Sequence, residues 1–173
     1  MPLFVDGYNL IFAASRKLPG FNIVHTETAR DNLLSLLAKY KSLHAERIMV
    51  FFDGGPEAAH LPRRTMIRGL DVLFSNPGVD ADDDIKYTVS HDDNPRGIRV
   101  ITSDNAIRVF VERCGATVTD SGEFLNSLQE TLKEHSLPQD EPMEKYEGGA
   151  AGEMDYWLKV FGTDEPKEKP PKK

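Results

Sequence analysis

The segment Leu3-Phe4-Val5-Asp6-Gly7 is typical of a short buried strand that stops at a carboxylate. The three apolar residues favour a strand, and the Asp-Gly pair ends it. A second apolar run at residues 47–52 has no polar face, which is typical of a central strand in a parallel sheet. It also stops at an Asp-Gly pair, at positions 53 and 54. Both segments therefore predict a buried strand that places an acidic residue at its carboxyl end.

The sequence around these two segments alternates between short apolar runs and stretches with helical periodicity. Further strands are predicted at residues 71–74, 98–102 and 116–118, and helices at residues 26–43, 81–91, 105–113 and 122–134. Residues 60–68 are predicted to be a loop. Because strands that alternate with helices form right-handed crossover units, the pattern indicates an α/β fold with a parallel central sheet flanked by helices.

Three regions differ in composition. Residues 1–137 hold the alternating pattern and are predicted to form one domain. Residues 138–162 are predicted to be an acidic, glycine-containing linker followed by a short helix, a C-terminal helical extension with Trp157 on its apolar face. Residues 163–173 are rich in proline and lysine, and we expect them to be disordered.

Composition excludes several classes of protein. The chain has 173 residues, of which 39% are apolar, and it contains no apolar run near the ~18 residues that span a bilayer. Its first residues lack the basic region of a signal peptide. Cys114 is the only cysteine, so an internal disulfide and a cysteine-based zinc site are both excluded. We therefore expect a cytoplasmic protein with no membrane partner.

The charge is unevenly distributed. The formal net charge is −7, which argues against a polyanionic partner, but residues 1–113 carry only −1 and residues 114–173 carry −6. Without the four acids Asp6, Asp82, Asp83 and Asp104, residues 1–113 would carry +3. The rest of the domain is thus mildly basic, which predicts weak and salt-sensitive binding to nucleic acid.

Acidic residues follow four successive predicted strands. Asp6 and Asp53 end the first and second strands, Asp82 and Asp83 follow the third, and Asp104 follows the fourth. The carboxyl ends of parallel strands share one edge of a sheet, and ligands bind there. Carboxylates that are close together repel each other, and Mg²⁺ or Mn²⁺ relieves that repulsion through oxygen coordination. The pattern predicts a metal site suited to phosphodiester hydrolysis.

Each of these acids also has a purely structural interpretation. Asp53 could be an ordinary turn residue, and Asp104 could cap the helix that follows it. Acids at 82–84 would favour the dipole of their helix without any metal. We expect Asp84 to be solvated, because Asp82 and Asp83 are predicted to take the inward positions.

Residues 4–11 (Phe-Val-Asp-Gly-Tyr-Asn-Leu-Ile) resemble the opening of the YacP-like NYN domain family, a branch of the PIN-like ribonucleases. The resemblance extends to residues 50–54, 81–85 and 102–104, and covers roughly residues 1–135. It implies a PIN-like Rossmann-type fold and a metal-dependent endoribonuclease.

The resemblance also implies roles for individual residues. Asp6, Asp82 and Asp104 match the central metal-binding acids, and Asn9 matches a residue that supports the site. Asp83 lies where relatives often carry a second acid, and Asp53 matches an acid whose role varies among related nucleases. One bacterial member of the family acts on mRNA at the ribosome. The resemblance therefore implies RNA as a partner and raises the ribosome as a second one, but the motifs themselves carry no information about the ribosome.

Three arginines could hold the RNA. Arg63, Arg64 and Arg68 lie in a stretch that contains no acid from residue 58 to residue 70. Arginine binds phosphate groups through two parallel hydrogen bonds, so we predict that this segment contacts the backbone of a single strand. The alternative is a loop that only keeps the surface soluble.

Other candidate contacts lie after the first strand. Tyr8 could stack on a base, or its ring could pack beside the strand. Arg16 and Lys17 form a second basic pair.

Two other functions stay open at the level of sequence. One is a non-catalytic module that binds RNA or the ribosome and retains the acids as remnants. The other is a DNA nuclease, because the same metal chemistry serves either sugar.

Overall fold

The computed structural model describes residues 1–22, 26–55, 62–76 and 78–136. All of them belong to one compact unit of the chain, Met1–Pro138. The predicted linker and helix at 138–162 and the predicted tail at 163–173 lie outside the described residues. Within the described part of the chain, no helix is both long enough and apolar enough to cross a membrane.

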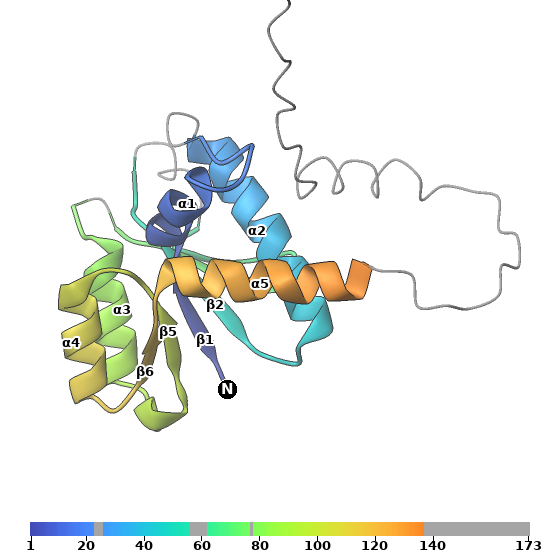
Figure 1. The fold of residues 1–173 in the computed structure, drawn as a ribbon. Coiled ribbons are helices and arrows are strands. Elements are labelled where there is room, and N and C mark those ends of the chain that lie inside the picture. Colours follow the sequence, from blue (N-terminus) through green and yellow to red (C-terminus); the bar gives the residue numbers. More distant parts are fainter. Residues whose placement is uncertain (23–25, 56–61, 77, 137–173) are drawn as a thin grey trace, which may run out of the picture. The chain divides into compact units, whose positions relative to one another are not determined.

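The central sheet has six strands in the order β3-β4-β2-β1-β5-β6 (Figure 1). The strands are β1 (Leu3–Asp6), β2 (Ile48–Phe52), β3 (Arg64–Ile67), β4 (Leu70–Phe74), β5 (Arg99–Ile101) and β6 (Thr117–Thr119). Every neighbouring pair is parallel except β3 and β4, which are antiparallel. The predicted α/β fold with a central sheet is therefore confirmed.

The edge strand β3 corrects one prediction. Residues 60–68 were expected to be a loop, but Arg64–Ile67 pairs with β4 through a tight turn. In that turn Arg68 and Gly69 have φ angles of 53° and 79°. The strand is short and exposes alternate side chains, so its sequence lacks the apolar run that marks a buried strand.

The helices are α1 (Gly7–Ser15), α2 (Thr26–Leu43), α3 (Ala81–Ser90), α4 (Asn105–Arg113) and α5 (Ser121–Ser136). Helix α3 packs beside α4, whereas α1 packs against both α2 and α5. The chain runs from β1 to β2 in one direction across the sheet and from β4 to β5 in the other. Right-handed crossovers therefore place α1 and α2 on one face of the sheet and α3 on the opposite face.

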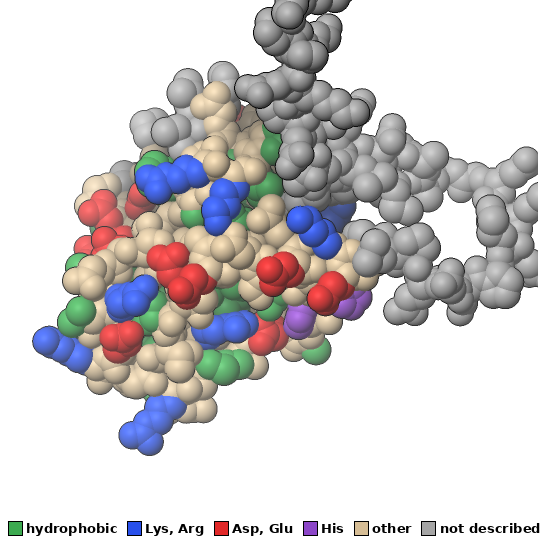
Figure 2. All heavy atoms as spheres, in the orientation of Figure 1, with side chains coloured by type: hydrophobic (Ala, Val, Ile, Leu, Met, Phe, Trp, Pro, Cys, Tyr) green, Lys and Arg blue, Asp and Glu red, His purple; other side chains and the backbone are tan. Residues whose placement is uncertain are grey.

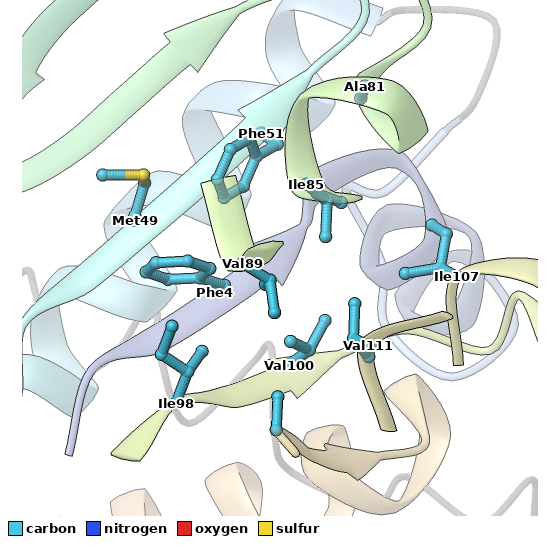
Figure 3. Packing of buried hydrophobic residues seen from close by; sticks show 11 residues of the cluster. Phe4, Met49, Phe51, Ala81, Ile85, Val89, Ile98, Val100, Ile107 and Val111 are labelled. Atoms are coloured by element: carbon cyan, nitrogen blue, oxygen red, sulfur yellow. The ribbon is translucent and has the colours of Figure 1, made fainter. Parts of the chain in front are cut away.

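Hydrophobic packing fixes α3 and α4 on their face of the sheet. Side chains from the strands point toward those from the two helices in Figure 3. The strands contribute Phe4, Met49, Phe51 and Val100, the residue before β5 contributes Ile98, and the helices contribute Ala81, Ile85, Val89, Ile107 and Val111. Successive side chains in a strand alternate between faces, so Asp6 lies on the same face as Phe4. The end of β1 thus directs its carboxylate toward the side of the sheet covered by α3 and α4.

Two glycines permit close approaches at this edge. A Cβ atom on Gly7 would lie 2.2 Å from Cε1 of Phe52 and 2.8 Å from the carbonyl oxygen of Phe51. A Cβ atom on Gly54 would lie 1.6 Å from the carbonyl oxygen of Ser75. Only glycine therefore lets α1 begin directly after β1, and lets the segments after β2 and β4 lie against each other.

Candidate functional site

The point where the sheet reverses its winding direction is the junction of β1 and β5. From β1 the chain continues to β2 on one side, while β5 pairs with β1 on the other side. In open α/β sheets, ligands bind outside the carboxyl ends of the strands at such a point. Asp6 ends β1, and Thr102 follows β5, so the candidate site is centred on these two residues.

Asp6 is held by hydrogen bonds on both carboxylate oxygens. The backbone N–H of Asn9 donates to Oδ1 at 3.2 Å, and its side-chain amide donates to Oδ2 at 2.6 Å. The hydroxyl of Thr102 donates to the same Oδ2 at 2.9 Å. Asp6 is 4% exposed and Thr102 is 0% exposed. Asn9 therefore orients the carboxylate of Asp6.

Thr102 connects two of the acids. While its hydroxyl donates to Asp6, the same oxygen accepts the backbone N–H of Asp104 at 3.0 Å. A single buried hydroxyl thus sets the distance between the end of β1 and the start of α4.

Asp53 and Asp104 both cap helices. Oδ1 of Asp104 accepts the N–H groups of Ala106 and Ile107 at 2.7 and 2.9 Å, at the start of α4. Oδ1 of Asp53 accepts the N–H of Ala81 at 2.7 Å. Asp53, which follows β2, therefore caps α3, a helix distant from it in the sequence. The capping interpretation of Asp104 is therefore realised, whereas Asp53 caps a helix for which it was not predicted as a cap. Both carboxylates lie at the edge where Asp6 lies.

The four acids share an electrostatic environment. Burial raises the pKa of Asp82 above its usual value, and the charges of Asp6, Asp104 and Asp53 raise it further, against the opposing effect of Lys86. The pKa of Asp6 is also raised, chiefly by burial and also by the charge of Asp53, although its hydrogen bonds from Asn9 and Thr102 oppose the shift. The acids at this edge therefore lie within one another's electrostatic field.

The first turn of α3 differs from the expectation. Asp83 is exposed, whereas Asp84 is 7% exposed and buried. The expectation that Asp84 is solvated is wrong because Asp84 lies three residues after the buried Ala81, and thus on the helix face that packs against the protein. Asp82 is partly buried, and its pKa is raised first by that burial and then by the charges of the other acids.

The three arginines have different environments. Arg63 donates from Nη2 to Oδ1 of Asp84 at 2.8 Å, and its side chain is 53% exposed. Arg64 binds both oxygens of Asp71 and also belongs to β3. Arg68 is exposed in the β3–β4 turn. Of the three, Arg63 is the one that reaches the helix carrying Asp82.

Tyr8 packs at the start of α1. Its ring meets that of Phe52 edge to face, with centroids 5.4 Å apart, and the residue is partly buried. The packing interpretation is thus realised on one side of the ring.

A further acid at this edge was missed by the sequence interpretation. Asp120 follows β6 directly and accepts hydrogen bonds from the hydroxyl of Ser103 at 2.7 Å and from the N–H of Gly122 at 2.8 Å. The hydrogen bond from Ser103 lowers its pKa more than any other contact. The signal was available: the fifth predicted strand, like the first, second and fourth, is followed within a few residues by an aspartate.

No three His, Cys, Asp or Glu side chains in the described part of the chain lie close enough to one another to hold a metal ion directly. The acids are therefore coupled by charge without forming a preassembled set of ligands. On the face shown in Figure 2, acidic and basic side chains are interspersed.

Comparison with known proteins identifies the family. The family model described as the YacP-like NYN domain matches residues 3–155. The chain belongs to the YacP-like NYN domain family. It is 30% identical over 128 residues to the uncharacterized protein YacP of Bacillus subtilis (strain 168), covering 73% of this chain and 74% of that protein. The NYN domain is a PIN-like nuclease fold, so the broad class of the family is nuclease.

Solved structures agree with this assignment. The crystal structure of Rae1 (YacP) from Bacillus subtilis aligns with a TM-score of 0.58 at 28% identity, covering 78% of this chain and 76% of that chain. The crystal structure of a single-substitution mutant of Rae1 aligns with the same TM-score and identity, covering 79% of each chain. The fold around the acidic edge is therefore that of an NYN domain.

Proposed function

We propose that this NYN domain is a divalent-metal-dependent endoribonuclease that cleaves single-stranded RNA at the carboxyl edge of its sheet. The observation that supports it best is the gathering of Asp6, Asp53, Asp82 and Asp104 at one edge of the sheet, where burial raises the pKa of Asp82 and the charges of the other three acids raise it further. A fold gains no stability by placing like charges in one another's field at a partly buried edge. A bound cation would offset that cost.

The donor chemistry fits Mg²⁺ or Mn²⁺. The side chains at the edge offer carboxylate oxygens, the ligands that these cations prefer, and Mg²⁺ keeps several of its waters when it binds protein. A hydrated ion needs fewer direct ligands, which agrees with acids that are coupled but not within direct ligand distance of one another. In this proposal Asp6, Asp82 and Asp104 hold the ion, with Asp53 beside them. A bound ion would supply activation of water and neutralisation of charge on the phosphate.

The side chains of the domain supply positioning. Asn9 and Thr102 orient the Asp6 carboxylate, and their hydrogen bonds favour its charged form and so oppose the rise in its pKa that burial causes. Asp83 is exposed beside Asp82 and is proposed to orient water at the rim of the site. Arg63 is proposed to contact the RNA backbone, because it is half exposed and reaches α3. Arg64 contributes less in this proposal, since its guanidinium is bound to Asp71.

The test is cleavage of a labelled single-stranded RNA by the Asp6→Asn, Asp104→Asn double variant with Mg²⁺ or Mn²⁺. We expect activity to fall by at least roughly 100-fold, because the ion loses two carboxylates that stabilise charge during the reaction. Asp82→Asn should cause a similar loss of activity. This substitution removes the charge of Asp82 without breaking any hydrogen bond described above. Asp31→Asn on the exposed side of α2 is the matched control. Full activity in the double variant, or activity that persists in EDTA, would contradict the proposal.

A second candidate is a non-catalytic module that binds RNA, or RNA on the ribosome. The observation that favours it is that Asp53 and Asp104 both cap helices, which explains these two acids without a metal. Titration with Mn²⁺ separates the two candidates, because RNA binding without Mn²⁺ binding favours the module. Parallel assays on RNA and DNA strands of the same sequence test the third option, a DNA nuclease.

A further inference from the structure

A hollow lies between α1 and α2, next to the acidic edge. Its volume is about 350 Å³, within the usual range for small-molecule sites. It is lined by Tyr8, Asn9, Ile11 and Phe12 of α1 and by Thr26 and Ala29 of α2. Asn9 belongs to both places, since its side-chain amide donates to Asp6. Anything bound in the hollow is therefore one side chain away from the proposed reaction site.

The walls of the hollow combine aromatic, aliphatic and polar groups, and a cationic group lies over one of its aromatic rings. Phe12 is 47% exposed, so part of its ring is accessible to a ligand. The guanidinium of Arg16 lies over the Phe12 ring, 4.4 Å from its centroid. Tyr8 is held on one side by Phe52. Aromatic rings beside an arginine are the groups that bind a nucleobase and its backbone phosphate in single-stranded RNA.

We propose that the hollow between α1 and α2 receives one nucleobase of the RNA strand whose neighbouring phosphate lies at the acidic edge. The base stacks on Phe12 beside Tyr8, and the guanidinium of Arg16 reaches the backbone. This inference rests on the proposed function, which supplies RNA as the ligand. It adds a subsite that binds a base rather than a phosphate. Stacking is tolerant of sequence, so the subsite sets affinity more than base preference.

The test measures binding of a short fluorescent single-stranded RNA by anisotropy, using the full chain with Asp82→Asn so that the RNA stays intact. A series of the same RNA carries one abasic site at each position in turn. In this background we expect Phe12→Leu to bind intact RNA at least about fivefold more weakly, the low end of base–aromatic stacking. In the parent with Phe12, we expect one RNA of the abasic series to bind more weakly than the intact RNA by a similar factor. Phe12→Leu should bind that abasic RNA and the intact RNA equally. Phe110→Leu on α4, where Phe110 is 39% exposed, is the matched control and should behave as the parent.

Three results would overturn the subsite: equal affinity of Phe12→Leu and the parent, an unchanged response of Phe12→Leu to every abasic position, or no binding of RNA by the parent. Cleavage assays on chains that retain Asp82 separate this inference from the proposed function. Binding that depends on Phe12 without cleavage retains the subsite and rejects the nuclease. Cleavage that is indifferent to Phe12→Leu retains the nuclease and rejects the subsite.

Discussion

Thr102 is the residue on which the geometry of the acidic edge depends most directly. It is fully buried, it donates to Asp6, and it accepts from the backbone of Asp104. A threonine in a short Thr-Ser-Asp segment gives no sign of this role in the sequence, because the partner acid is distant along the chain. The hydrogen bond from Thr102 also lowers the pKa of Asp6 against the effect of burial.

Thr102→Val is expected to lower the free energy of unfolding by about 1 to 3 kcal/mol, because it removes a buried donor and leaves the Asp104 N–H without its acceptor. It should also raise the pKa of Asp6 further. Thr102→Ser keeps the hydroxyl and is the control. Urea denaturation measures the first effect, and an NMR titration of the Asp6 carboxyl measures the second. Equal values for the two variants would show that the hydroxyl has no such role.

At the scale of elements, the β3–β4 hairpin is held by a buried acid between two arginines. Asp71 is 7% exposed and accepts hydrogen bonds from Arg64 and from Arg47, which precedes β2. These bonds lower the pKa of Asp71, with the one from Arg64 contributing most. Arg64, one of the three arginines predicted to bind RNA, therefore attaches the edge strand β3 to the sheet.

Asp71→Asn is expected to destabilise the domain by about 1 to 2 kcal/mol, since the arginines are half exposed and the pair is partly screened. Because the folded pKa of Asp71 lies below its ordinary value of 3.8, its contribution is present above that pH and is lost as the pH falls through the folded pKa. Urea denaturation at neutral and acidic pH measures both effects. The exposed Asp31→Asn variant should show neither effect, and an Asp71→Asn variant as stable as wild type at neutral pH would contradict this account.

At the scale of the whole molecule, the sheet order brings together charges that are far apart in the sequence. Asp6, Asp53, Asp82 and Asp104 come from the ends of different strand–helix units and lie at the same edge because the parallel strands β1, β2, β4 and β5 share it. Their mutual repulsion is a property of the topology rather than of any one residue, and it opposes folding while the acids are ionised.

Asp82→Asn tests the combined cost of burying this charge and placing it beside the other acids, through the pH dependence of thermal stability. The folded pKa of Asp82 lies above its ordinary value of 3.8, so its contribution to stability is fully present below that pH and is lost as the pH rises through the folded pKa. At neutral pH, Asp82→Asn should therefore melt a few degrees higher than Asp83→Asn, which alters the same helix turn at an exposed position. The difference should vanish in acid. A lower melting temperature for Asp82→Asn at neutral pH would contradict the coupling.

Periodicity and strand ends predicted most of this fold because its strands and helices bury long apolar patterns. The helix at 26–43 was predicted with the bounds of α2, and the end of β2 was correctly located at Phe52. Strand β3 escaped prediction because its stability comes from pairing and from the Asp71 ion pairs, neither of which leaves an apolar pattern. Asp84 was misassigned because three adjacent acids give no signal for which of them faces inward. The hollow beside Asn9 depends on how α1 packs on α2, which no local pattern encodes.

The two helix caps have a consequence for how a polyanion approaches this edge. Asp53 and Asp104 receive the N–H groups that begin α3 and α4, where the aligned peptide dipoles carry partial positive charge. The charges of the Asp53 and Asp104 carboxylates are thus partly offset by backbone N–H groups without any bound cation. Under the proposed function, an approaching phosphate chain would therefore meet a weaker repulsive field than four bare carboxylates would produce.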